Sequence, residues 1–483
     1  MTLDHDACYR ALLARDARFD GVFFTGVRTT GIYCRPVCTA KTPARGSCRF
    51  FTSAAMAERE GFRPCLRCRP ELAPGRAPLD AVRSVARVAA ARIEAGGLNG
   101  GGLAHLAGEL GLSTRQLRRA VRQEFGVSPI ELALTSRLLM AKRLIAETNL
   151  PMTEVAFASG FASVRRFNDA FAAHYRLTPT IMRRNHRTPG GGDCLRLLLA
   201  YRPPYAWREL LNFLGERATP GVECVGDGSY RRTVAVGKHR GWLGVSPVKD
   251  RNLLAAKLAT TLVPVLPAVL GRLKNLLDTD ARPDAIEAHL RGDRTLAPLV
   301  RRTPGLRVPG AFDGFELAVR AVLGQQVSVR GASTLAGRLA ARFGEPIDTA
   351  QACLNRLAPT AERLAAARVS DIGGIGIPRP RAESLRSLAR AAADGEIELA
   401  PGPDPAAAVA GLVELPGIGD WTAQYIALRA LRWPDAFPAG DLGLRKALGA
   451  TSAAEVTSRA ERWRPWRAYA AMHLWQSLSN HRE

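Results

Sequence analysis

The spacing of hydrophobic residues predicts a helical segment between about residues 79 and 187. Apolar positions recur at helical spacing in its first half, at Leu103, Leu106, Leu110, Leu112, Leu117 and Val121. The stretch 108–113 (GELGLS) interrupts this pattern, and Ser113 is a good N-cap for the helix that follows it. A similar break returns at 155–163 (VAFASGFAS). The pattern therefore predicts two helix-turn-helix units, joined by a helix near residues 137–147.

The second helix of each predicted unit carries polar side chains suited to reading bases. A recognition helix enters the major groove, where arginine, glutamine or asparagine can bond to base edges. The alternative is that these side chains form solvated faces or contact phosphates only. The candidates are Arg115, Gln116 and Arg119 in the first unit and Arg165, Arg166 and Asn168 in the second.

The same segment resembles the AraC-type DNA-binding domain. The resemblance covers all of it, and the aromatic residues of its second half carry it most clearly: Phe161, Phe167, Phe171 and Tyr175. It implies an all-helical domain with tandem helix-turn-helix units that bind double-stranded DNA. RNA polymerase is a further expected partner.

The charge of the chain also favours a polyanionic partner. Its 483 residues include 68 Lys and Arg against 44 Asp and Glu, a net charge of +24. No apolar run of membrane-spanning length and no secretory leader occurs in the sequence. We therefore expect a cytoplasmic, nucleoid-associated monomer without a membrane partner.

Four cysteines near the start of the chain have the spacing of a metal site. Cys34 and Cys38 form one close pair, and Cys65 and Cys68 form a second. Two such pairs can surround one tetrahedral Zn²⁺ ion. The alternative is two disulfides in a secreted module, which the missing leader disfavours. The other cysteines are interpreted as having no role: Cys8, Cys48, Cys194, Cys224 and Cys353.

The residues around these cysteines resemble the N-terminal zinc domain of Ada, the bacterial adaptive-response protein. The matching stretches are 28–38 (RTTGIYCRPVC) and 61–70 (GFRPCLRCRP). In that family the first cysteine is both a zinc ligand and the acceptor of a methyl group from a DNA phosphotriester. The resemblance implies that role for Cys34, and the alternative is that Cys34 is a structural ligand only.

The last third of the chain carries a catalytic pattern. The turn 415–419 (LPGIG) lies between an apolar stretch and a predicted helix, which indicates a helix-hairpin-helix. Gly417 and Gly419 allow close approach of a DNA phosphate. Asp441 follows a Gly/Pro-rich loop about two dozen residues downstream. This arrangement resembles the base-excision DNA glycosylases, with Asp441 as the catalytic acid; the alternative is a helix N-cap.

Within that superfamily, residues from about 195 onward most resemble AlkA, the 3-methyladenine DNA glycosylase II. Supporting stretches are 202–207 (RPPYAW), 320–328 (RAVLGQQVS) and 461–469 (ERWRPWRAY). The resemblance implies an aromatic pocket of Trp421, Tyr425 and Trp475 around a flipped base, although core packing is the alternative for the tryptophans. It also places Gln326 at the tip of the loop that fills the gap left by that base.

Two features refine the expected reaction. Trp421 stands where strand-cleaving relatives have a Schiff-base lysine, which predicts release of the base without strand cleavage. The chain has no Pro-Cys-His-Arg motif, so the O6-methylguanine acceptor domain of full-length Ada is missing. We therefore expect a monofunctional glycosylase that releases alkylated purines such as 3-methyladenine and 7-methylguanine.

Together these patterns predict a multidomain α+β protein. The expected parts are a small α/β zinc module at 5–74, an all-α helix-turn-helix domain at 79–187, an AlkA-like (TBP-like) α/β subdomain at 193–300 and an all-α helix-hairpin-helix core at 301–483. The expected function is an alkylation-response transcriptional regulator joined to a DNA repair enzyme. The alternatives are a transcription factor with a catalytically silent glycosylase domain and a glycosylase that its front half merely localises.

Overall fold

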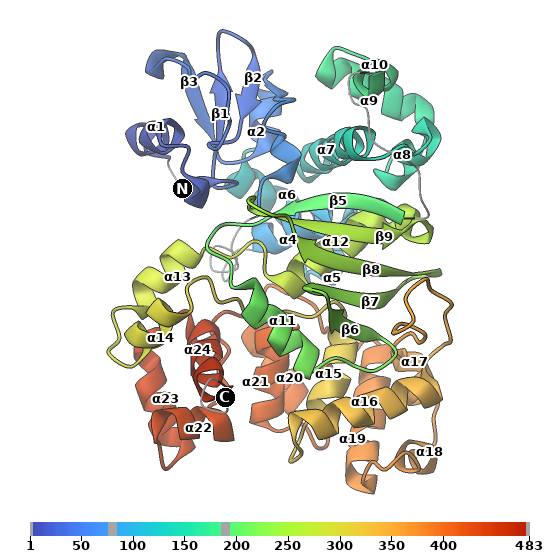
Figure 1. The fold of residues 1–483 in the computed structure, drawn as a ribbon. Coiled ribbons are helices and arrows are strands. Elements are labelled where there is room, and N and C mark those ends of the chain that lie inside the picture. Colours follow the sequence, from blue (N-terminus) through green and yellow to red (C-terminus); the bar gives the residue numbers. More distant parts are fainter. Residues whose placement is uncertain (1–2, 76–84, 185–193, 480–483) are drawn as a thin grey trace. The chain divides into compact units, whose positions relative to one another are not determined.

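The computed structural model describes residues 3–75, 85–184 and 194–479 (Figure 1). Its contacts divide the chain into two compact units, Met1–Pro203 with Val248–Gly271 and Pro204–Pro247 with Arg272–Glu483. Gly/Pro-rich breaks that suggest domain boundaries occur at 73–78, 188–192 and 304–310. The second lies outside the described residues, and the first lies partly outside. Among the described residues, no helix is long and apolar enough to span a membrane.

The first unit begins with a small mixed sheet, in the strand order β3-β1-β2-β4. Strand β1 pairs antiparallel with β2 and β3, and β2 pairs parallel with β4. Phe24, Tyr33, Phe51 and Phe62 form the core between this sheet and helix α2. The elements are α1 (His5–Leu13), β1 (Phe24–Val27), β2 (Ile32–Cys34), β3 (Cys48–Phe51), α2 (Ala54–Arg59) and β4 (Arg63–Pro64).

The helical segment follows, and its two predicted helix-turn-helix units are present. Ser113 caps α6 and Ser163 caps α9, each by accepting a hydrogen bond from a backbone amide in the first turn. The helices are α4 (Val85–Glu94), α5 (Gly102–Glu109), α6 (Thr114–Phe125), α7 (Pro129–Glu147), α8 (Met152–Ala158), α9 (Val164–Tyr175) and α10 (Pro179–Arg184).

The linking helix α7 is longer than the sequence analysis expects. It begins at Pro129 rather than near residue 137, because Ser128 and Glu131 form a capping box and proline suits the first helical position. The first unit then continues with β5 (Cys194–Ala200), which pairs antiparallel with β9 (Leu253–Ala259). Helix α12 (Leu266–Leu277) carries the chain into the second unit.

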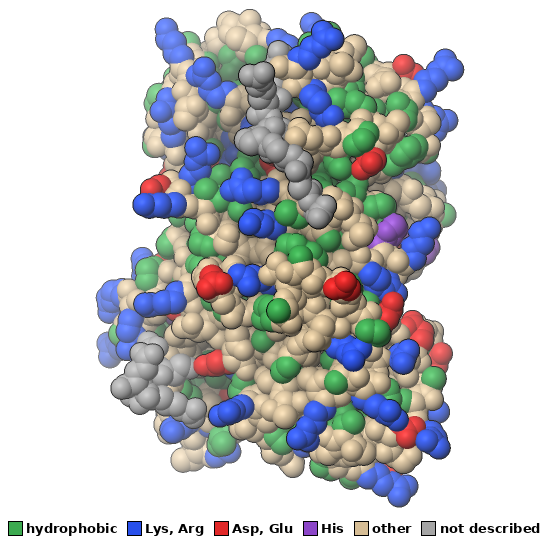
Figure 2. Space-filling model, turned by 45° about the vertical axis from the view of Figure 1, so that its right-hand side comes forward, with side chains coloured by type: hydrophobic (Ala, Val, Ile, Leu, Met, Phe, Trp, Pro, Cys, Tyr) green, Lys and Arg blue, Asp and Glu red, His purple; other side chains and the backbone are tan. Residues whose placement is uncertain are grey.

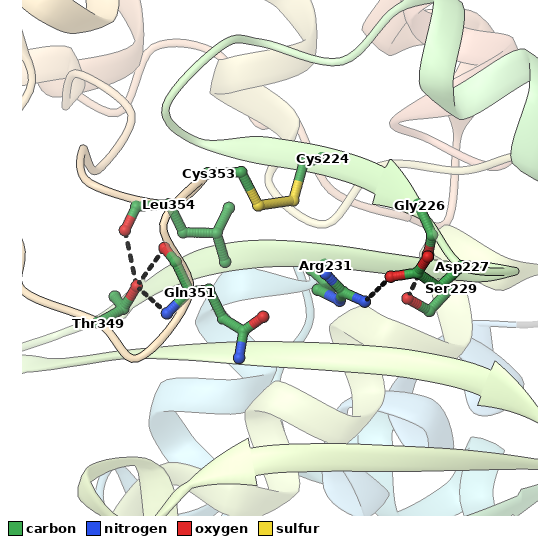
Figure 3. The surroundings of a disulfide bond; sticks show 9 residues. All are labelled: Cys224, Gly226, Asp227, Ser229, Arg231, Thr349, Gln351, Cys353 and Leu354. Carbon is green, nitrogen blue, oxygen red and sulfur yellow. Dashed lines mark hydrogen bonds and ion pairs between the residues drawn. A yellow bond between two sulfur atoms is a disulfide. The ribbon is translucent and has the colours of Figure 1, made fainter.

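The second unit opens with helix α11 (Trp207–Glu216) and three strands. These strands form an antiparallel meander of β6 (Glu223–Gly226), β7 (Ser229–Val236) and β8 (His239–Pro247). Figure 3 shows a disulfide between Cys224 of β6 and Cys353, 129 residues later in the chain. The interpretation of these two cysteines as having no role is therefore wrong, because the fold brings a strand and a distant loop together.

The rest of the second unit is helical, and its final helices surround the predicted catalytic residues. Helix α21 packs against α15 and α20, while α24 packs against α14 and α22 (Figure 1). The helices are α13 (Pro283–Leu290), α14 (Leu296–Arg302), α15 (Gly314–Leu323), α16 (Val329–Phe343), α17 (Ala361–Ala365), α18 (Val369–Gly373), α19 (Arg379–Ala393), α20 (Pro405–Val413), α21 (Asp420–Arg429), α22 (Leu442–Leu448), α23 (Ala453–Ala460) and α24 (Arg467–Ser479). The predicted α+β class is confirmed.

Candidate functional site

The four predicted cysteines converge on one point of the first unit. Strands β2 and β4 pair in parallel, with Tyr33 opposite Pro64. Because Cys34 follows Tyr33 and Cys65 follows Pro64, these two cysteines become neighbours. The sulfur atoms of Cys34, Cys38, Cys65 and Cys68 all lie within 4.8 Å of one another. Four thiolates bound to one zinc ion stand about 3.8 Å apart, given Zn–S bonds of about 2.3 Å. The donor set and its spacing fit one Zn²⁺.

A buried arginine supports one side of this cluster. The backbone amide of Arg35 donates to the Cys68 sulfur at 3.3 Å, and its guanidinium donates to the Cys68 carbonyl. The same guanidinium forms a buried ion pair with Asp20. Cys34 and Cys68 are partly exposed, whereas Cys38 and Cys65 are buried. Cys34 and Cys68 are therefore the two most solvent-accessible residues of the four.

Helix α7 of the helix-turn-helix segment contacts the cysteine cluster directly. Lys142 on α7 is only 2% exposed, and its ammonium group donates to the Cys65 carbonyl at 3.1 Å. It also pairs with the buried carboxylate of Glu71. Arg69 bridges Glu71 to Glu147 at the end of α7. The cysteine-containing module and the helix-turn-helix segment are thus joined by buried, mutually paired charges.

A second buried carboxylate lies at the same interface. Tyr33, which precedes Cys34, donates to Glu58 at 2.9 Å, and Thr135 of α7 donates to it at 2.6 Å. His174 of α9 lies 3.7 Å from the same carboxylate. Burial raises the pKa of Glu58 to about 7, although these hydrogen bonds and Lys142 act to lower it. The linking helix α7 and helix α9 of the second unit are therefore both connected, through Glu58, to the strand that carries Cys34.

The predicted base-reading residues all lie on exposed faces of α6 and α9. The opposite faces are buried through Leu117, Val121 and Phe125 in α6 and through Phe167, Phe171 and Tyr175 in α9. Gln116 differs from the others because its side-chain oxygen accepts a hydrogen bond from the Ser113 amide at 2.8 Å. Its oxygen therefore serves the helix cap, and base contact by any of the six remains a prediction.

The predicted hairpin is present between α20 and α21. Gly417 has a φ of +80°, and a β-carbon there would lie 1.9 Å from the hydroxyl of Ser384 on α19. Both observations require glycine at this position. Gly419 has open space around it and forms the N-cap of α21 without a capping side chain. Backbone amides in the first turn of α21 are thus left without a side-chain cap.

The loop that holds Gln326 is tied to this hairpin. Gln325, which the sequence analysis missed, donates to the Gly417 carbonyl at 2.9 Å and to the Thr422 hydroxyl at 3.0 Å. Arg381 donates to the Gln325 carbonyl. Gln326 itself is exposed, with a φ of +55° that is uncommon for a non-glycine residue. The only sequence signal for Gln325 was its position next to Gln326.

Asp441 lies where three hydrogen-bond donors meet. One oxygen accepts from the Leu444 amide at 3.0 Å and from the Trp475 indole at 2.9 Å. The other accepts from the Trp421 indole at 2.9 Å. The N-cap alternative is thus also true, because Asp441 caps α22, but the cap occupies only one oxygen. Leu442 beside it is 75% exposed, so this end of α22 is open to solvent.

The three predicted aromatic residues gather around this carboxylate. The rings of Trp421 and Tyr425 stack at 5.6 Å with an interplanar angle of 11°, and Trp475 lies 6.3 Å from Tyr425. Because Trp421 and Tyr425 touch, they form one platform and not the two walls of a slot. Trp463 and Trp466, by contrast, are buried core residues.

The phenol of Tyr425 lies in a strongly basic environment. Burial acts to raise its pKa, but the guanidinium groups of Arg429, Arg217 and Arg320 lower it to about 8. Arg429 donates to the phenol oxygen at 3.0 Å and also holds the carbonyls of Pro309 and Gly310. Arg429 was not predicted from the sequence, although its position four residues after Tyr425 puts both on one helix face.

Basic side chains cover the surface far more densely than acidic ones on the face that Figure 2 shows. This agrees with the net charge of +24 and suits contact with DNA phosphates.

Family models match four successive parts of the chain. They are described as the metal binding domain of Ada over residues 7–71, a helix-turn-helix domain over 106–185, the AlkA N-terminal domain over 195–313 and the HhH-GPD superfamily of base excision DNA repair proteins over 319–466. Each of the expected resemblances is therefore found, and in the expected order. The exact boundaries of the domains remain a prediction.

Curated relatives match the whole chain and its parts. The "Probable bifunctional transcriptional activator/DNA repair enzyme AlkA" of Mycobacterium tuberculosis is 41% identical over 99% of this chain and 97% of its own length. DNA-3-methyladenine glycosylase 2 of Escherichia coli is 38% identical over 57% of this chain and 95% of its own length. Escherichia coli Ada is 48% identical over 71 residues, which are 15% of this chain and 20% of that protein.

The solved structures add support for the fold. The 3-methyladenine DNA-glycosylase from Archaeoglobus fulgidus is 24% identical and covers 58% of this chain and 97% of its own, with a TM-score of 0.51. This likeness is one of fold alone, and it agrees with the antiparallel strands and helical core described above.

Proposed function

Because this chain belongs to the family of bifunctional transcriptional activators and DNA repair enzymes that includes the Mycobacterium tuberculosis protein, we propose that it performs two specific reactions. The first is irreversible transfer of a methyl group from a DNA methylphosphotriester to Cys34. The second is hydrolytic release of alkylated purines, of the 3-methyladenine and 7-methylguanine type, at Asp441. We assign them to residues 5–74 and 301–483, with DNA reading at 79–187 and an accessory subdomain at 193–300.

The methyl transfer is a displacement at carbon. A new bond forms between the Cys34 sulfur and the methyl carbon, the methyl–oxygen bond breaks, and its electron pair stays on the phosphate. A zinc ion bound by the four cysteines supplies the chemistry that keeps their thiols ionised. The exposure of Cys34 supports its choice as acceptor over the buried Cys38 and Cys65.

The excision uses the charge already present on the lesion. An N3- or N7-alkylated purine is cationic, so its glycosidic bond breaks with the electron pair leaving on the base. Asp441 faces the cationic sugar that develops. Water then adds to the cationic carbon of the sugar and releases a proton to solvent, which leaves the abasic sugar. The aromatic rings favour the cationic base by cation–π attraction. The single observation that carries this proposal is the Asp441 carboxylate held among Trp421, Tyr425 and Trp475.

One experiment tests both reactions together. The full chain is incubated with methylated DNA, and both the released bases and the mass of the protein are measured. Release of methylated purines together with a methylated protein supports the proposal. A methyl adduct without released bases indicates instead a transcription factor with a silent glycosylase domain, and released bases without an adduct indicate a glycosylase whose front half only localises it.

We predict that Cys34 alone becomes methylated. Peptide mapping by mass spectrometry after exposure to methylphosphotriester DNA should find one added CH₂ on the peptide with Cys34, because a partly exposed thiolate can act as a nucleophile. Cys68→Ser serves as the matched comparison at the other partly exposed ligand. A methyl group on Cys38 in place of Cys34 would overturn the assignment.

We predict that methylation of Cys34 strengthens binding of promoter DNA by residues 79–187. The transfer removes one negative charge from the cysteine cluster, which reduces repulsion of the DNA backbone. The affinities of methylated and unmethylated protein should differ most at low salt and converge as salt rises. Equal affinities at low salt are the result that excludes this switch.

RNA polymerase as a partner and a monomeric state complete the proposal. Light scattering should give the mass of a single 52.1 kDa chain.

A further inference from the structure

The carboxylate of Asp441 is held by the edges of two tryptophan rings. The indole N–H groups of Trp421 and Trp475 each donate to a different carboxylate oxygen, both at 2.9 Å. With the Leu444 amide, three donors occupy the carboxylate. Because a carboxylate offers about four acceptor positions, few are left for other partners. The orientation of the charge is therefore set before any DNA binds.

The three donors come from separate elements, which makes this arrangement specific. Trp421 lies in the first turn of α21, Trp475 on α24, and the Leu444 amide on α22. Gly443 lets them meet, since a β-carbon there would lie 2.9 Å from the Asp441 oxygen and 3.3 Å from the Trp475 ring. The stack on Tyr425 fixes the plane of Trp421. The N–H edges are thus aimed at the carboxylate.

We infer that Trp421 and Trp475 are positioning residues, which hold the Asp441 carboxylate by their N–H groups in the orientation that excision needs. This inference rests on the proposed excision and goes beyond stacking of the tryptophans on the base. An indole N–H donates but cannot accept, so it can hold a carboxylate oxygen only as a hydrogen-bond donor. It also carries no net charge. An arginine in its place would neutralise the carboxylate that must face a developing cation.

The test removes the N–H groups and keeps aromatic rings in place. In Trp421→Phe and Trp475→Phe, we expect the single-turnover rate of base release to fall by about tenfold or more, because each variant loses a hydrogen bond to a charged group. Trp463→Phe is the matched control. Trp463 is 1% exposed, and its N–H has no hydrogen-bond partner among the described residues. That variant should keep the rate of the parent.

A binding measurement separates positioning from general structural damage. DNA duplexes carry, at the lesion position, either a cationic pyrrolidine or a neutral tetrahydrofuran in place of the sugar. The parent protein should prefer the cationic analogue, and both Phe variants should lose that preference while binding the neutral analogue as before. In an Asp441→Asn background, Trp475→Phe should have no further effect, because the indole acts through the carboxylate.

Three results would overturn the positioning role of the tryptophans. Phe variants with the parental rate and the parental preference show that the tryptophans act by stacking only, and they overturn the inference. Equal weakening of both analogues, or additive losses in the double variant, also overturns it. Failure of the parent protein to release any base would refute the proposed excision, whereas the preference for the cationic analogue can be measured without turnover.

Discussion

Replacing Asp441 with asparagine should lower the rate of alkylated-base release by on the order of a hundredfold or more. Asparagine keeps the shape of the side chain and can still accept the Leu444 amide. It removes the charge that faces the developing cation, and its NH₂ group cannot accept from an indole N–H. The rate is measured under single-turnover conditions with DNA that contains 7-methylguanine. Binding of undamaged duplex should be nearly unchanged, because the hairpin at Gly417 and Gly419 is untouched.

A matched variant and the reaction products provide the controls for this prediction. Asp394→Asn makes the same chemical change at an exposed acid on the end of α19 and should excise at the parental rate. The products of the parent protein should be a free base and an intact abasic strand, since position 421 holds no lysine. Near-normal excision by Asp441→Asn contradicts the assignment of the acid. A DNA adduct trapped by borohydride contradicts the single-step hydrolysis.

Replacing Lys142 with methionine should destabilise the first unit by about 3 kcal/mol, because it leaves a buried carboxylate without one of its two cations. Burial acts to raise the pKa of Glu71, but Lys142 and Arg69 lower it below its usual value. A carboxyl group whose pKa is lower in the folded state than in the unfolded state stabilises the fold at pH values above its unfolded-state pKa. This contribution is lost as the pH falls through its folded-state pKa. The difference between parent and variant should therefore be full at neutral pH and shrink in acid.

Urea unfolding of the full chain measures this effect. All seven tryptophans lie in the second unit, at 207, 242, 421, 433, 463, 466 and 475. Their fluorescence therefore reports the second unit, while zinc release to a chelating dye reports the first. Lys142→Met should shift only the zinc-release transition, and Lys41→Met at an exposed position should shift neither by more than about 0.5 kcal/mol. An unchanged transition for Lys142→Met contradicts the prediction.

The sequence indicated the residues of both candidate sites more clearly than the contacts that surround them. Cysteine spacing and the hairpin pattern are local signals, so Cys34, Cys38, Cys65, Cys68 and Asp441 were found directly. The start of α7 at Pro129 is also a local signal, given by the capping box of Ser128 and Glu131. The prediction nevertheless placed this helix only near residues 137–147.

Most of the contacts that were not predicted depend on the fold; the bond from Arg429 to Tyr425 is the exception, because these residues stand four apart on one helix. Lys142 and Glu71 belong to no sequence motif, and only tertiary packing shows that they are buried and paired. The indole donors of Asp441 come from 20 residues before it and 34 residues after it. Cys224 and Cys353 lie further apart still. No periodicity or motif in a single sequence joins positions so distant.

Strand β5 belongs structurally to the half of the chain that precedes it. Arg143 and Glu147 of α7 bond to the carbonyl and amide of Leu198 on β5. Arg202 just beyond that strand donates to the carbonyls of Asp20 and Gly75. Residues of the AlkA N-terminal domain match thus complete the packing of the regulatory half. A regulatory half expressed on its own must therefore include β5, because these hydrogen bonds lie within one compact unit.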